Sequence, residues 1–255
     1  SKLTYAQRKG QYVWINGDHQ PQATTAANST TGASASGAPT GTAGDTNYLR
    51  FLSGNYALFA TYFITGTQTI LAPVYTAGTG INLQLDATDN EGAQYVFGGL
   101  GTTNPHYKVI GTSAGFFIRL KIKIADVSGE DLCEVGFRKQ EAYATDPLDY
   151  NDKAGLNVNG GTVYSSTILT NAADVNTSTG ATVADAGTVD LEVRVSAAGV
   201  VTYFIGGVQY STVAYTFTSA LGVYPYANFR HDTTSPGAVS LVELEIGPLS
   251  ERERD

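Results

Sequence analysis

Three acidic residues in one short segment are the first side chains whose spacing could support catalysis. The segment GEDLCEVGF contains Glu130, Asp131 and Glu134. Most glycoside hydrolases need two carboxyl groups that flank one bond, one as the acid and the other as nucleophile or base. On a strand, Asp131 and Glu134 point to opposite faces, and Glu130, which shares a face with Glu134, begins in a Ser-Gly turn. The spacing therefore predicts no glycosidase site.

The histidines offer no better catalytic set. His19, His106 and His231 lie in the loop-like contexts GDHQP, NPHYK and FRHDT. A polysaccharide lyase needs positioned side chains such as His or Tyr to move a proton. None of the three histidines has a recognisable partner pattern. We therefore expect surface or turn histidines, and a chain that is not an enzyme.

Two oxygen-rich loops are weak candidates for calcium. The segments DATDNEG and TDPLDYNDK supply Asp86, Asp89, Asp149 and Asp152. Calcium takes six to eight oxygen ligands, commonly carboxylates and carbonyls from a flexible loop. Neither segment has the EF-hand spacing, and turn-forming Asp and Asn explain both without an ion. We expect no metal and no cofactor.

Sixteen tyrosines form the other possible site. Exposed aromatic rings stack on sugars and also anchor protein interfaces. The tyrosine-rich stretch 203–226 is expected to lie on adjacent strands, with about half of its rings in the core. Its other rings, with Tyr210, Tyr224 and Tyr226 as candidates, would contact a glycan or a neighbouring subunit, and we favour the subunit contact.

The elements that must position these side chains are predicted to be strands. From about residue 47 onward apolar residues alternate with polar ones, and no segment predicts a helix of three turns. Segment 188–210 predicts a hairpin in which Gly206-Gly207 supplies the positive φ of a tight turn. Segment 116–124 places Arg119, Lys121 and Lys123 on one face, and Glu243 and Glu245 share a face near the C-terminus. Because opposite charges across a ladder contribute roughly 0.2–1 kcal/mol per pair, we expect these two strands to be neighbours; separate solvated faces are the alternative.

Composition excludes several classes of protein. The 255 residues carry a formal net charge of −8, which argues against a general nucleic-acid binder. No apolar run approaches the roughly 20 residues of a membrane-spanning helix. Cys133 is the only cysteine, so no intramolecular disulfide can form, and a buried thiol is expected. No signal peptide is apparent at Ser1, and we expect a protein made in a reducing cytosol.

The chain divides into three zones. Residues 1–46 are expected to form an extended N-terminal arm and a low-complexity strap, because residues 19–46 are too poor in apolar side chains to bury a core. Residues 47–247 are expected to form the folded domain, and residues 248–255 a charged tail. The arm carries a basic and aromatic set: Lys2, Tyr5, Arg8, Lys9, Tyr12 and Trp14.

The second half of the chain resembles the concanavalin-like, or laminin-G-like, jelly-roll family. The resemblance rests on VDLEVRV, GVVTYFIGGVQY and LGVYPYANFRHDTTSPGAVSLVELEIG, and it covers roughly residues 80–247. It implies an all-β fold, a two-sheet antiparallel jelly-roll β-sandwich. With the arm and strap, the whole chain looks like a capsid decoration (cement) protein of tailed bacteriophages.

This resemblance implies a structural protein of the virion, made in the host cytoplasm and placed on the capsid exterior. The arm residues named above would bind the major capsid protein, and the strap would order across neighbouring copies, with a homotrimer as our guess. The same family contains glycoside hydrolases, polysaccharide lyases and lectins. The alternative is therefore a lectin-like carbohydrate-binding module, or a tail or fibre component that contacts host surface glycans.

Overall fold

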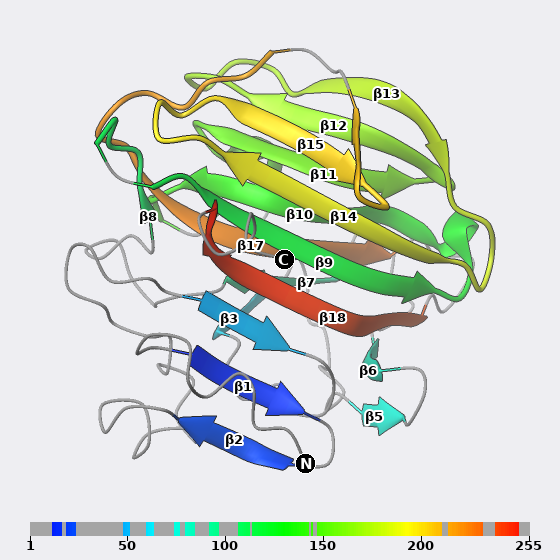
Figure 1. Cartoon of the computed structure of the whole chain (residues 1–255). Coiled ribbons are helices and arrows are strands. Elements are labelled where there is room, and N and C mark those ends of the chain that lie inside the picture. The colour runs from blue at the N-terminus through cyan, green and yellow to red at the C-terminus, as the bar shows by residue number, and fades with distance from the viewer. Residues whose placement is uncertain are drawn as a thin grey trace.

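The structure is a computed structural model. It describes seven strands within the first 96 residues and, after them, residues 107–112, 114–142, 144, 147–210, 214–231 and 238–249. Its strands form two sheets packed face to face, with β9, β14 and β18 in the front layer and β10, β11 and β17 behind them (Figure 1). The jelly-roll β-sandwich predicted from the sequence is therefore confirmed.

Sheet A is the front layer. Its order in the described residues is β16 (Val208–Tyr210), β15 (Val201–Ile205), β14 (Thr188–Val195), β9 (Phe116–Ile124), β18 (Ala238–Pro248), β3 (Tyr48–Phe51), β1 (Tyr12–Asn16) and β2 (His19–Ala23). Beside β18 also lies β6 (Gly80–Gln84), which pairs with β5 (Val74–Thr76).

Sheet B is the second layer. Its order in the described residues is β13 (Val175–Thr182), β12 (Thr162–Ile168), β11 (Lys153–Asn159), β10 (Glu130–Lys139), β17 (Gly222–His231), β7 (Gly92–Val96) and β4 (Ala60–Phe63), with β8 (Tyr107–Lys108) beside β17. The helical elements of the described residues are two short 3₁₀ turns, η1 (Val127–Gly129) and η2 (Pro147–Asp149). No helix among them is long and apolar enough to cross a membrane.

The core lies between the sheets and follows from the alternation of each strand. On β9, Ile118, Leu120 and Ile122 are at most 1% exposed, while the residues between them face outward. Val135 and Leu156 of sheet B are fully buried in the same apolar cluster. Burial of each such side chain stabilises the fold by roughly 1.5–3 kcal/mol. Cys133 is buried in this core, as predicted.

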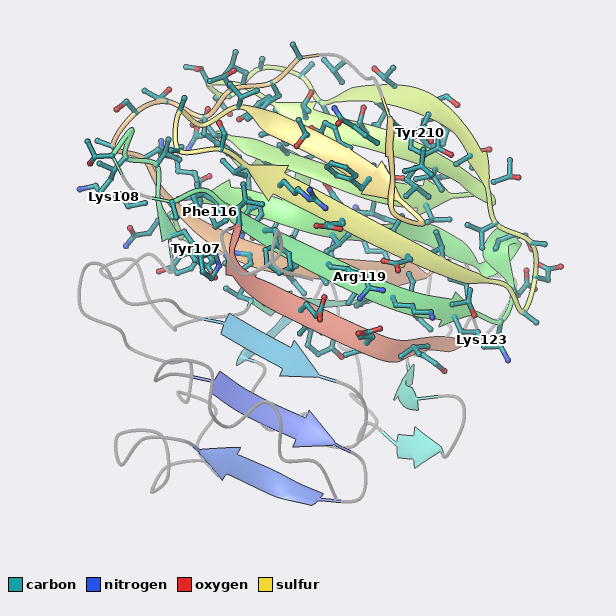
Figure 2. The ribbon with its side chains drawn as sticks, in the orientation of Figure 1. Tyr107, Lys108, Phe116, Arg119, Lys123 and Tyr210 are labelled. Atoms are coloured by element: carbon teal, nitrogen blue, oxygen red, sulfur yellow. The ribbon has the colours of Figure 1, made fainter. Side chains whose placement is uncertain are left out.

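The predicted neighbourhood of the basic and acidic strands is confirmed. On the outer face of sheet A, Lys121 pairs in register with Glu243, and Arg119 with Glu245. The Arg119 guanidinium (Figure 2) also donates to Asp190 of β14, with Nε to Oδ1 at 2.9 Å. Burial alone would lower the pKa of Arg119, but this hydrogen bond and the three carboxylates raise it, so the guanidinium stays charged.

The hairpin predicted at 188–210 forms as β14, β15 and β16, and Gly206 and Gly207 have φ of +58° and +80°. One strand departs from strict alternation, and one expectation is wrong. A bulge between Leu241 and Glu243 turns Leu241 into the core, where strict alternation would have faced it outward. The tyrosine-rich stretch is not on adjacent strands, because β15 and β16 belong to sheet A and β17 to sheet B.

Two strands of the segment predicted as an arm continue sheet A. β1 pairs in parallel with β3, residues 12–15 lying beside residues 48–51, and β2 then pairs with β1 (Figure 1). In the described residues, sheet A therefore includes strands that precede residue 47, the predicted start of the folded domain.

Candidate functional site: the polar face of sheet B

The outer face of sheet B carries polar side chains, and several of them are buried although burial of a polar group is costly. On β10, Cys133, Val135 and Phe137 point into the core, so Glu134 and Arg138 point away from it. Register extends this face across the neighbouring strands, and we call the set the polar face. Its members are Gln94, Glu134, Arg138, Lys153, Asn157, Tyr164, Ser166, Tyr224, Tyr226 and Asn228.

A buried ion pair lies at the centre of the polar face. Lys153 Nζ is 3.0 Å and 3.1 Å from the two carboxylate oxygens of Glu134, and both side chains are fully buried. Tyr226 OH donates to Glu134 Oε1 at 2.8 Å. Gly155 makes room for this arrangement, because a Cβ there would lie 3.0 Å from Glu134 Oε1. Such burial is tolerated only because each charge has a charged or hydrogen-bonding partner.

The network continues from Lys153 toward the edge of the sheet. Lys153 Nζ donates to Ser166 Oγ at 2.9 Å, and Ser166 Oγ donates to Asp174 Oδ1 at 2.8 Å. Asp174 Oδ2 accepts from the Asn176 amide, whose Oδ1 accepts from Asn157 Nδ2 at 3.1 Å. This chain of hydrogen bonds fixes the side chains of β11, β12 and β13 relative to one another.

The opposite end of the polar face is closed by an aromatic side chain. Tyr150, which follows η2, is fully buried, and its OH donates to Gln94 Oε1 at 2.8 Å. The Arg138 guanidinium lies 4.3 Å from the Tyr150 ring centre and 5.6 Å from that of Tyr224. Arg138 is 3% exposed and Tyr224 2%, so this end offers no open surface.

The end of the polar face over β11–β13 is open. Tyr164 is half-buried, Asn176 and Ser178 are exposed, and register places Tyr164 between Asn157 and Ser178. Asn157 is 4% exposed, and its buried Oδ1 has no hydrogen-bond partner among the described residues. We call Asn157, Tyr164, Asp174, Asn176 and Ser178 the amide patch.

The amide patch has the features of a site for a hydroxylated ligand. A half-buried ring offers an apolar surface, and the amide and hydroxyl groups around it donate and accept hydrogen bonds. A buried acceptor without a partner costs stability unless a ligand or water supplies the missing donor. The hydrogen bonds between Asp174, Asn176 and Asn157 hold these groups in place before any ligand arrives.

The buried tyrosines of this region are neutral donors. Burial is the main cause that raises the pKa of Tyr226, and the charge and hydrogen bond of Glu134 raise it further. Burial likewise raises the pKa of Tyr150, although the charge of Arg138 opposes the shift. At neutral pH both phenols therefore keep their protons.

The residues predicted to bind a capsid lie mostly outside the described residues. Lys2, Tyr5, Arg8 and Lys9 are not described, and Tyr12 and Trp14 have only their backbone described, in β1. The calcium candidates Asp86 and Asp89 are also outside the described residues. Of the carboxylates considered for glycoside hydrolysis, Glu130 and Asp131 have no described side chains.

The structure separates the remaining predicted site residues. Tyr224 and Tyr226 lie on the closed part of the polar face, whereas Tyr210, the last residue of β16, is half-buried in the other sheet (Figure 2). Asp149 is exposed at the end of η2, and Asp152 is buried and accepts from the Thr170 backbone N–H at 3.0 Å. Within the described residues, no group of three or more His, Cys, Asp or Glu could hold a metal ion.

Sequence reasoning missed the residues of the amide patch. Tyr164 lies in TVYSSTI, a strand whose polar residues occur on both faces, so alternation does not indicate which face points into the core. Lys153 of β11 and Asp174, which directly precedes β13, contact each other and share Ser166 of β12 as a hydrogen-bond partner. A signal was present in the single lysine of residues 151–187, because a lone charge on an apolar strand needs a partner.

Comparisons with known proteins support the fold. No family model matches this chain, and no curated protein matches it in sequence. A protein of unknown function from Shewanella oneidensis MR-1 has a TM-score of 0.52 and 12% identity, over 80% of this chain and 86% of its own. The carbohydrate recognition domain of Emp47p has a TM-score of 0.50 and 10% identity, over 74% and 88% of the two chains. At such identity these likenesses describe the jelly-roll fold and nothing further.

A third comparison corrects the expectation that this chain is not an enzyme. The alginate lyase PA1167 from Pseudomonas aeruginosa matches with a TM-score of 0.47 and 12% identity, over 69% of this chain and 85% of its own. Enzymes thus occur among the structures with this sandwich. The expectation rested on the absence of a carboxylate pair and of a histidine set in the sequence, and such patterns do not cover every catalytic arrangement that a jelly roll can carry.

Proposed function

We propose that this chain is a carbohydrate-binding domain whose site is the amide patch. The observation that carries the proposal is the half-buried Tyr164 beside the exposed Asn176 and Ser178. A sugar ring can stack on the aromatic ring while its hydroxyls form hydrogen bonds with the exposed side chains of Asn176 and Ser178. The carbohydrate recognition domain of Emp47p, which has a similar fold, is in keeping with this reading.

Preorganisation supports the same proposal. Asn157, Asn176 and Asp174 are tied to one another and, through Ser166, to the buried Lys153. Side chains already fixed lose little conformational entropy when a ligand binds, so more of the contact energy appears as affinity. A loop of exposed Ser and Asn would lack this advantage.

We expect Tyr164→Ala to weaken glycan binding at least about tenfold, because the variant removes the stacking surface at the centre of the patch. Binding of the full chain to a printed glycan array, followed by calorimetric titration with the strongest hit, measures the effect. The matched control is Tyr210→Ala, since Tyr210 is also a half-buried strand tyrosine but lies in sheet A. An equal loss in both variants, or none in Tyr164→Ala, would rule out the amide patch as the site.

A second candidate function is decoration of a capsid shell, with copies of the chain attached to the major capsid protein. The observation that favours it is the position of β1 and β2 at one end of sheet A, because β1 follows the basic residues Lys2, Arg8 and Lys9 in the sequence. That end lies opposite β13 (Figure 1), so a shell bound there would leave the amide patch facing outward.

The capsid hypothesis predicts that reversing charge in the leading segment abolishes attachment. The triple variant Lys2→Glu, Arg8→Glu and Lys9→Glu keeps the full chain but removes its attraction to an acidic shell surface. Co-sedimentation with capsids should fall to background in this variant and persist in Tyr164→Ala. Full attachment of the charge-reversed chain would contradict the role given to these residues.

A further inference from the structure

We infer that the amide patch selects neutral sugars over sugars that carry a carboxylate or sulfate group. This inference rests on the proposed function and adds the class of ligand. It follows from the charged side chains of the polar face around Tyr164.

One cation belongs to this part of the sheet, and it is already engaged. Residues 151–187, which include β11, β12 and β13, contain a single basic residue, Lys153. Lys153 is fully buried, 3.0 Å from Glu134 Oε1 and 3.6 Å from Asp174 Oδ1. Its single positive charge is therefore shared between two carboxylates, and the group of three has a net charge of −1.

The negative charge lies on the ligand side of this group. Asp174 belongs to the amide patch and keeps 9% of its side chain exposed, whereas the side chain of Glu134, on β10, is fully buried. Asp174 contacts Ser166, the next residue after Tyr164 on the same face of β12, and two like unit charges near a protein surface repel by about 4 kcal/mol at about 4 Å and about half as much at twice that distance. An acidic sugar on Tyr164 would meet this repulsion without a cation to offset it.

The remaining cation of the polar face is too far along the sheet to help. Arg138 is 3% exposed at the closed end, between Tyr150 and Tyr224, and donates to Gln94 and to the Lys139 carbonyl. Apart from Asp174, the groups that meet a ligand at the open end are uncharged amides and hydroxyls, which suit sugar hydroxyls that both donate and accept.

The test uses the full chain on a printed array of neutral, uronate-containing, sialylated and sulfated glycans. We expect the hits to be neutral, and titration with the strongest hit should give the same affinity between about 0.01 M and 1 M salt, a range over which the screening length falls from about 30 Å to 3 Å. A sulfated counterpart of that hit should bind at least about tenfold more weakly, the equivalent of about 1.4 kcal/mol.

Asp174→Asn supplies the matched variant, because it removes the charge and retains the size of the side chain. We expect this variant to reduce the ratio between its affinity for the neutral glycan and its affinity for the sulfated counterpart, whatever it does to the neutral affinity itself, with thermal unfolding as the check on its fold. Asp185→Asn removes a charge outside the patch and should leave the ratio of the two affinities unchanged.

The outcomes separate this inference from the proposed function. Acidic hits that are lost in Tyr164→Ala would overturn the selectivity and leave the carbohydrate site in place. An affinity for the neutral hit that falls with added salt would also overturn the selectivity, whatever the fate of the Asp174 variant. No hits at all, or hits indifferent to Tyr164→Ala, would overturn the proposed function and this inference with it.

Discussion

Replacing Lys153 with methionine is expected to lower the free energy of unfolding by about 3–5 kcal/mol, because the change leaves the Glu134 carboxylate buried without its cation. Both side chains are fully buried and joined at 3.0 Å and 3.1 Å. The same change also removes the donor to Ser166 Oγ, which links the ion pair to Asp174. Urea unfolding of the full chain measures the effect.

Two controls isolate the buried charge as the cause. Lys139→Met removes a cation that lies 3.8 Å from Asp152. Because the Lys139 side chain is 34% exposed, this variant should lose only about 0–1 kcal/mol of the free energy of unfolding. The double variant Glu134→Gln and Lys153→Met removes both charges and should recover most of the lost stability. If the single and double variants are equally destabilised, the loss comes from packing rather than from an unpaired carboxylate.

Alkaline pH should destabilise the fold steeply, beginning near pH 10. Burial is the main cause that raises the pKa of six tyrosines among the described residues above the ordinary value of 10: Tyr95, Tyr107, Tyr150, Tyr203, Tyr215 and Tyr226. Below pH 10 these phenols are neutral in both the folded and the unfolded chain, and their contribution to stability is fully present. Above pH 10 the unfolded chain releases protons that the folded chain retains, so stability falls by about 1.4 kcal/mol per pH unit for each tyrosine.

Urea unfolding at a series of pH values from neutral to about 11 tests this expectation. The free energy of unfolding should decline several kcal/mol over the last unit. Phenolate absorbance of the buried tyrosines should appear together with unfolding and not before it. Phenolate absorbance that rises while the fold persists would contradict the burial of these hydroxyl groups, and so would a flat stability profile.

Much of the fold could be predicted because it follows from local patterns. Alternation on 116–124 and 188–195 placed Ile118, Leu120 and Leu191 inward, and the complementary charges of Arg119 and Glu245 predicted which strands pair. The Gly206-Gly207 turn marked the hairpin. Each of these signals lies within about ten residues or in one pair of opposite charges.

The polar face could not be predicted in the same way, because it depends on partners far apart in the chain. Glu134 was weighed as a possible catalytic carboxylate, yet its partners are Lys153, 19 residues away, and Tyr226, 92 residues away. Tyr224 and Tyr226 have the alternation of exposed side chains and are nevertheless buried, since alternation assigns a face and not what covers it. The prediction that the tyrosine-rich stretch lies on adjacent strands failed for a similar reason, because strands that are consecutive in a jelly roll can belong to different sheets.

The place of β18 in the middle of sheet A bears on how the chain is made. This strand, residues 238–248, separates β9 from β3, so most of the polypeptide must leave the ribosome before these two can be joined into one sheet. Until then the nascent chain presents an unsatisfied strand edge on β9, where a second nascent chain could add. Translation of residues 238–248 therefore becomes the committing step of folding, and a message truncated before residue 238 would yield an aggregating product rather than a smaller domain.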